Sequence, residues 1–293
     1  MTNQKPPVPY NPYQPRDWQL AHGKTLVLGP VSRIMGILNV TPDSFSDGGQ
    51  FDTVDKAIDQ AAKMIEAGAD IIDVGGESTK PNADPVDQNL EQQRVLPIVE
   101  QLSQRFDTII SIDTYRSDTA ERAIKAGAHI VNDVGGFQYD AAMAAIVCQY
   151  GAGVCLMHNS RNRVIGDDIV ADQIAYLKQC VLSATEAGVT RQQITIDPGF
   201  GFGKNVEENL LLLDKFCLLH ELGLPVLTGT SRKRFTGAVL GEDDNSDNRD
   251  KVTAATSVVA RMAGSSVFRV HDVMSNKLAL KLADSVLNTR NSG

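Results

Sequence analysis

The stretch Ala67-Gly68-Ala69-Asp70-Ile71-Ile72-Asp73-Val74 joins the end of a helical pattern to a short apolar run. The same junction returns at Ala126-Gly127-Ala128, which precedes Ile130-Val131-Asn132. Glycine is the usual residue just past a helix C-terminus, because it adopts the left-handed conformation at little cost. Four more apolar runs follow shortly after a glycine: Gly151, Gly188, Gly223 and Gly264. Six such joints predict a repeated unit in which a helix leads into a buried strand.

Two further apolar runs, residues 33–38 and 108–112, lack the glycine but have the composition of strands. Helical spacing separates the strands, as in Ile58, Ala61, Ala62 and Ile65. The last helix is expected at residues 276–287. Eight strand–helix alternations in 293 residues favour an α/β fold, a single (β/α)8 TIM barrel at residues 31–293, since such a barrel typically needs about 250 residues. A doubly wound open sheet is the alternative. We expect residues 1–30 to be a short N-terminal extension and residues 241–250 to form an acidic loop.

The charge balance and the cysteines limit the kinds of partner. The chain carries 28 Lys and Arg against 36 Asp and Glu, a formal net charge of −8, so a nucleic-acid binder with a basic face is not expected. Its four cysteines lie far apart with no CxxC pair, which argues against a zinc site or a disulfide framework. No apolar run approaches the length of a membrane span, and the proline-rich N-terminus does not resemble a signal peptide. We therefore expect a cytoplasmic protein that acts without nucleic acid or membrane.

In α/β barrels the chemistry lies at the carboxyl ends of the strands, and each predicted strand here leads into polar or charged residues. One group offers the donors and acceptors that suit a flat heterocycle: Asp113, Asn132, Asp197 and Lys233. A second group suits an anion and its metal ion: Asn39, Ser231, Arg269 and His271.

Each of these residues also has a purely structural interpretation. Asp or Asn after a strand often caps the next helix, since its side chain accepts an unpaired backbone amide. Arg232-Lys233-Arg234 has the composition of a solvated charge run. We interpret His158 as a buried core histidine and assign it no catalytic role.

The strand ends are similar to those of the dihydropteroate synthase family. The longest matching stretches are residues 35–49, MGILNVTPDSFSDGG, and residues 197–204, DPGFGFGK. Shorter ones are IDVGGEST at 72–79, SIDT at 111–114, NDV at 132–134, SRK at 231–233 and RVHDV at 269–273. The resemblance implies an enzyme that joins 6-hydroxymethyl-7,8-dihydropterin diphosphate to 4-aminobenzoate and releases diphosphate. It also implies Mg²⁺ as the cofactor and a homodimer as the usual assembly.

The resemblance implies a role for each site residue. The pterin would lie against Asp113, Asn132, Asp197 and Lys233, of which Asp113 and Lys233 are the expected catalytic residues. Aminobenzoate would lie among Thr79, Pro81, Phe202, Ser231 and Arg234. The diphosphate would be held by Thr79, Lys80, Arg269 and His271, and Asn39 would be the ligand of Mg²⁺.

The chain departs from the family pattern in its loops. Lys80 stands where many members carry arginine, which keeps the charge but not the bidentate geometry. The segments Gly135-Gly136-Phe137 and His158-Asn159-Ser160-Arg161-Asn162-Arg163 are also atypical. Two other functions stay open at this point: a pterin-binding methyltransferase barrel, which would not need Arg269, His271 and Lys233, and a catalytically silent relative that only binds pterin.

Overall fold

The computed structural model describes residues 10–40, 50–77, 86–161 and 163–291. Its centre is a parallel sheet with the strand order β8-β7-β6-β5-β4-β3-β10-β9. These strands are β3 (Arg33–Asn39), β4 (Ile71–Gly75), β5 (Ile109–Asp113), β6 (Ile130–Asp133), β7 (Gly153–Met157), β8 (Ile194–Asp197), β9 (Leu227–Thr228) and β10 (Val267–Val270). A parallel bridge between Ile196 and Val226 joins the two ends of the sheet. The eight predicted strands are therefore confirmed, and so is the barrel rather than the open sheet.

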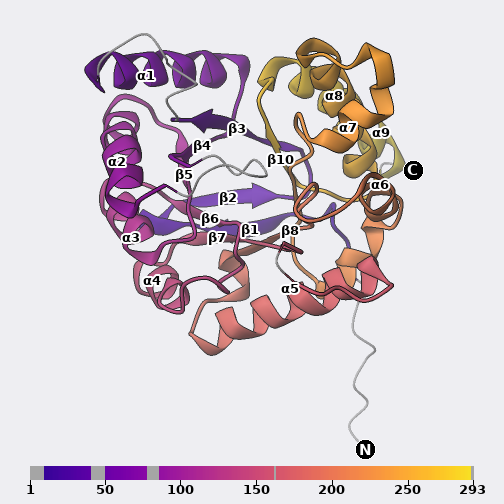
Figure 1. Cartoon of the computed structure of the whole chain (residues 1–293), viewed down its shortest axis with the longest axis horizontal. Helices are drawn as coiled ribbons and strands as arrows, with labels where there is room; N and C mark the ends of the chain where they lie inside the picture. Colours follow the sequence, from indigo (N-terminus) through magenta and orange to yellow (C-terminus); the bar gives the residue numbers. More distant parts are fainter. Residues whose placement is uncertain (1–9, 41–49, 78–85, 162, 292–293) are drawn as a thin grey trace, which may run out of the picture.

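Helices surround the strands as an outer ring (Figure 1). They are α1 (Gln50–Ala67), α2 (Gln88–Arg105), α3 (Ser117–Lys125), α4 (Met143–Tyr150), α5 (Ile169–Glu186), α6 (Val206–Asp214), α7 (Arg234–Leu240), α8 (Ser246–Met262) and α9 (Val273–Asn291). Short 3-10 turns are η1 (Ala21–Gly23), η3 (Arg191–Gln193), η4 (Phe216–Leu222) and η5 (Gly241–Asp243). No helix of the described part of the chain is long and apolar enough to cross a bilayer.

The junction glycines have the conformation that the sequence pattern requires. Gly68, Gly127, Gly188 and Gly264 all have φ between 95° and 117°. Gly151, just past α4, is left-handed at φ 61°. These positive angles end each helix and turn the chain into the next strand, which is why the pattern locates the strands so well.

The acidic segment at residues 241–250 is not the loop that we expected. Residues 241–243 form η5, and α8 begins at Ser246. The Asn245 side chain caps α8 by accepting from the backbone N–H of Asn248. The polar first turn of α8 faces water, so its sequence resembles a loop although its backbone is helical.

The N-terminal extension contains a hairpin that packs under the barrel. Strands β1 (Arg16–Gln19) and β2 (Thr25–Leu28) pair antiparallel. Trp18, which is 1% exposed, belongs to a cluster with Leu26, Leu28 and barrel residues that include Met35 and Ile71. Its indole N–H donates to the carbonyl of Gln193 at 2.8 Å. The hairpin thus covers the amino ends of the barrel strands, opposite the predicted site.

Candidate active site

One cavity at the carboxyl ends of the strands brings together six of the predicted site residues. They come from five strands or the loops that follow them: Asp113, Asn132, Asp197, Phe202, Lys233 and Arg269. Val134, Met157, Gly199, Phe200 and Gly229 complete its wall. The cavity is narrow and combines buried charge with aromatic surface, as a site for a flat polar heterocycle requires.

Arg269 and two carboxylates form the charged floor of this cavity. The guanidinium of Arg269 donates from Nε to Asp73 Oδ2 and from Nη2 to Asp113 Oδ2, each at 2.6 Å. The amide of Asn132 donates to the same Asp73 oxygen at 3.2 Å. Asp73 itself is 0% exposed. The floor is a preorganised network in which two acids share one permanent cation.

Burial shifts the pKa values of the floor in opposite directions for acids and bases. Burial raises the pKa of Asp113 to about 7, although Arg269 opposes the shift. It also raises the pKa of Asp197. It lowers the pKa of Lys233 to about 8, and the Arg269 charge adds to that shift. Burial disfavours charge on Arg269 as well, but Asp73 and Asp113 outweigh it and raise its pKa. Asp113 and Lys233 therefore change charge near neutral pH, as acid–base groups of active sites often do.

The glycine-rich turn after β8 fixes Asp197 and Phe202 in the site. Asp197 Oδ1 accepts from the backbone N–H of Gly199 at 2.7 Å. Lys204 holds the turn by donating to the carbonyls of Gly199 and Phe202, at 2.7 and 3.3 Å. A Cβ atom at Gly201, where φ is 77°, would come within 3.0 Å of the Lys233 side chain. The glycines thus allow the turn to pack tightly against Lys233.

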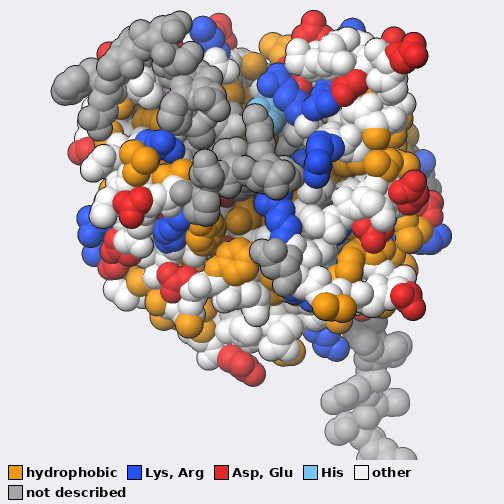
Figure 2. All heavy atoms as spheres, viewed as in Figure 1, with side chains coloured by type: hydrophobic (Ala, Val, Ile, Leu, Met, Phe, Trp, Pro, Cys, Tyr) orange, Lys and Arg blue, Asp and Glu red, His pale blue; other side chains and the backbone are white. Residues whose placement is uncertain are grey.

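Basic side chains lie at the mouth of the cavity. Lys233 Nζ is 4.2 Å from the centre of the Phe202 ring, and the guanidinium carbon of Arg161 is 4.5 Å from it. Arg234 is exposed at the first residue of α7. Figure 2 shows Lys and Arg side chains around the middle of the face that it presents. The paired acids and Arg269 thus lie at the floor of the cavity, and Lys233 and Arg161 lie against the Phe202 ring.

The remaining predicted residues either do not line this cavity or lie outside the described residues. Ser231 Oγ and His271 Nδ1 are 2.9 Å apart, and the backbone N–H of His271 donates to the same hydroxyl. Asn39 ends β3. A Cβ atom added to Gly75 would lie 3.8 Å from Asn39 Oδ1 and 3.6 Å from Asp113 Oδ2, so both side chains face this glycine. Neither Ser231, His271, Asn39 nor Arg234 lines the cavity that the described residues form. Thr79, Lys80 and Pro81 lie outside the described residues.

Comparisons with known proteins point to one family. Residues 35–271 match the model of the family of pterin binding enzymes. Dihydropteroate synthase of Bacillus subtilis is 42% identical over 272 residues, which are 92% of this chain and 94% of that protein. Dihydropteroate synthase of Xanthomonas albilineans, solved with 4-aminobenzoic acid, is 37% identical with a TM-score of 0.87, and the match covers 92% of this chain and 98% of that one. The Clostridium difficile enzyme, solved in the presence of pteroic acid, is 44% identical with a TM-score of 0.85 over 88% and 98% of the two chains.

This chain belongs to the dihydropteroate synthase family. The resemblance on which the sequence prediction depends is therefore confirmed. Within this dihydropteroate synthase fold, the structure adds three residues to which we assigned no role from the sequence: Asp73, Arg161 and Lys204. The sequence did contain a signal for Asp73. An aspartate inside a short apolar strand is costly to bury unless a cation pairs with it, so its position indicates a buried ion pair.

His158 has a structural partner. His158 is 0% exposed, and its Nε2 lies 2.9 Å from Asp172 Oδ2. Burial, aided by Lys204, lowers its pKa to about 3 even though Asp172 opposes the shift. A neutral, fully enclosed ring has no access to substrate, in line with the core interpretation.

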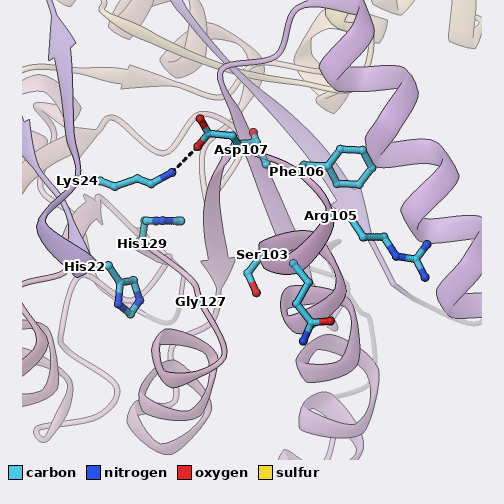
Figure 3. Close-up of a pocket in the computed structure, with 10 residues that line it drawn as sticks. His22, Lys24, Ser103, Arg105, Phe106, Asp107, Gly127 and His129 are labelled. Carbon is cyan, nitrogen blue, oxygen red and sulfur yellow. Dashed lines mark hydrogen bonds and ion pairs between the residues drawn. The ribbon is translucent and has the colours of Figure 1, made fainter.

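A larger hollow of about 450 Å³ lies at the opposite end of the barrel (Figure 3). His22, Lys24, Asp107 and His129 line it. The Lys24 ammonium is paired with Asp107 at 2.8 Å. Burial, aided by Lys24, lowers the pKa of His129 to about 4. The Lys24–Asp107 pair and the neutral His129 ring offer little free charge to a ligand, and active sites of α/β barrels lie at the other end.

Proposed function

We propose that this chain joins 6-hydroxymethyl-7,8-dihydropterin diphosphate to 4-aminobenzoate, giving 7,8-dihydropteroate and diphosphate. The reaction is that of the family to which the chain belongs, and it makes the protein a transferase of folate biosynthesis. One observation of the structure carries the proposal: Asp113, Asn132, Asp197 and Lys233 line a single cavity with Arg269.

The pterin ring fits the polarity of the floor. Asp113 and Asp197 accept hydrogen bonds from ring N–H groups, whereas Asn132 and Lys233 donate to the ring oxygen and nitrogens. Each of the two aspartates and Asn132 is at most 8% exposed. A ligand that left one of them without a hydrogen-bond partner would therefore bind more weakly, because the desolvation of that group would not be compensated. This requirement selects a heterocycle with several donors on adjacent edges.

The chain's residues promote departure of the diphosphate by stabilising charge. When the bond between the pterin methylene carbon and the diphosphate oxygen breaks, positive charge develops on the methylene and the conjugated ring. The buried Asp113 carboxylate stabilises that charge, because its field is strong in a site that excludes water. The aromatic amine then forms the new C–N bond and releases a proton to solvent. Since that amine is unprotonated at neutral pH, the chain needs no strong general base.

The diphosphate role falls to Arg269 and His271, and to Thr79 and Lys80, which lie outside the described residues. Both ion pairs of Arg269 use Nε and Nη2, so contact with the diphosphate would come from Nη1. His271 follows β10 and is oriented by Ser231. Thr79 and Lys80, in the segment that follows β4, complete this part of the proposal.

The donor set fits Mg²⁺ brought in with the diphosphate. No cluster of three or more His, Cys, Asp or Glu side chains able to hold a metal occurs among the described residues. The amide oxygen of Asn39, at the end of β3, is a hard neutral ligand beside Asp113. Mg²⁺ is commonly bound by one or two protein oxygens together with substrate phosphates and water. Bound there, it would neutralise charge on the leaving diphosphate.

The proposal includes a homodimer that works in the cytoplasm. Helix α9 exposes Met274, Leu278, Leu282 and Val286, each 40–67% accessible. Spaced four residues apart, they form one apolar stripe, which a second copy of the chain would cover. The four cysteines are free thiols, which fits a reducing compartment.

The deciding experiment measures diphosphate release and 7,8-dihydropteroate when the purified chain is mixed with pterin diphosphate and Mg²⁺. Release should depend on 4-aminobenzoate and match product formation one to one. Pterin binding without product would instead support the silent relative. Methyl transfer from a methylated folate to a corrinoid, without diphosphate release, would support the methyltransferase.

A further inference from the structure

We infer that Arg161, from the loop after β7, binds the carboxylate of the second substrate and thereby selects an acidic arylamine. The inference rests on the proposed function. It gives a role to a loop in which this chain departs from the sequence pattern of its family. Its basis is the position of Arg161 relative to Phe202 and the direction in which the second substrate must point.

The reaction fixes that direction. The amine must reach the methylene carbon of the pterin at the floor of the cavity, where Asp113 and Asp197 lie. The carboxylate is para to the amine, so it must point outward, past Phe202 and away from the two acids. An anion at that position needs cations at the mouth, because it loses part of its hydration there.

The loop after β7 holds Arg161 at this position. Asn159 Oδ1 accepts from the backbone N–H of Arg161 at 3.0 Å, while its amide donates to the carbonyl of Val134 and the hydroxyl of Tyr139. The backbone N–H of Ser160 donates to the carbonyl of Phe202. The loop is therefore tied to the two neighbouring loops, and Arg161 starts from an anchored backbone.

The guanidinium of Arg161 is oriented by the ring of Phe202. Its carbon lies 4.5 Å from the ring centre. Stacking engages the face of a guanidinium, whereas carboxylates bind to its N–H edge. Arg161 is half-buried, and burial lowers its pKa, with the Arg234 charge acting in the same direction. The charge of Arg161 also lowers the pKa of Lys233. Two cations, Arg161 and Lys233, thus lie against one ring, and an anion beside them would relieve their repulsion.

The test compares two nucleophiles that differ only in charge, 4-aminobenzoate and the neutral 4-aminobenzamide. In Arg161→Gln, KM for 4-aminobenzoate should rise about tenfold, while KM for the amide, KM for the pterin diphosphate and kcat stay within about twofold of wild type. Arg161→Lys should restore part of the preference for the acid, because it keeps the charge without the planar edge.

Arg163→Gln is the matched control, since Arg163 lies on the same loop but stacks on Tyr176 and pairs with Asp172. It should leave the ratio of the two KM values unchanged. Equal rises in KM for acid and amide in Arg161→Gln would overturn the inference, because Arg161 would then only pack against Phe202. An unchanged KM for the acid would overturn it too. Failure of the proposed function itself would be distinct, since wild type would then form no product from either amine.

Discussion

Asp113 is the residue on which the chemistry depends most. Replacing it by Asn keeps an acceptor oxygen but removes the negative charge that opposes the developing cation. We expect Asp113→Asn to lower kcat about 100-fold, the scale of losing one electrostatic contact in a transition state, and to weaken binding of the pterin diphosphate only a few-fold. Single-turnover rates and equilibrium binding measure the two effects separately. Asp107→Asn, at an exposed position remote from the cavity, is the control, and equal losses of rate and affinity would contradict the assignment.

The pKa values of Asp113 and Lys233 predict a narrow pH optimum. Asp113, with its pKa raised to about 7, gains its required negative charge as pH rises through 7. Lys233, with its pKa lowered to about 8, loses its positive charge as pH rises through 8. The profile of kcat/KM, which reports the free enzyme, should therefore be bell-shaped with its maximum between these values. The acidic limb should disappear in Asp113→Asn, and a limb that persisted would belong to another group.

Sequence predicted the site residues whose position depends on local structure. Asp113 and Asp197 each end a strand and Asn132 is the last residue but one of β6, and a barrel brings such ends to one rim whatever the details of packing. Asp73 and Arg161 were not predicted, because their roles depend on tertiary partners. Arg269 reaches Asp73 across 196 residues of sequence, and Arg161 meets Phe202 through a contact between two loops. No periodicity in the chain encodes such contacts.

At the scale of elements, the glycine-rich turn after β8 lends itself to a paired test. Gly203 and Gly151 both have positive φ, 71° and 61°. A Cβ at Gly203 would meet the backbone of residues 160 and 161 at 2.7 Å, whereas a Cβ at Gly151 would meet nothing within 4 Å. Gly151→Ala should therefore cost about 1 kcal/mol of unfolding free energy, the usual strain of a left-handed alanine, and leave the kinetics unchanged.

Gly203→Ala should cost more than that strain and also raise KM for 4-aminobenzoate, since the turn carries Phe202 and its displacement would move Arg161. Urea unfolding and steady-state kinetics on both variants check the pair. Identical kinetics for the two variants would show that the contact between the turn and the loop after β7 does not position the second substrate.

At the scale of the whole molecule, the N-terminal hairpin is part of the barrel's core. Trp18 is 1% exposed and hydrogen-bonded to Gln193, so Trp18→Ala should cost about 3–5 kcal/mol of unfolding free energy. Val27, 39% exposed on the paired strand β2, provides the matched control, and Val27→Ala should change stability by less than about 0.5 kcal/mol. A loss for Trp18→Ala as small as that of the control would mean that the barrel folds without its hairpin.

The apolar stripe of α9 predicts the assembly. A dimer with twofold symmetry buries the same patch on both copies, so one substitution changes the interface twice. Leu278, 63% exposed at the middle of the stripe, is the position to change, and Leu182, 44% exposed on α5, is the control.

Sedimentation velocity should find a dimer for wild type and Leu182→Glu but a monomer for Leu278→Glu. A monomeric wild type would refute the dimer, and a dimeric Leu278→Glu would place the interface on another face. Because none of the described residues of α9 lines the cavity, the monomeric variant should retain aminobenzoate-dependent diphosphate release.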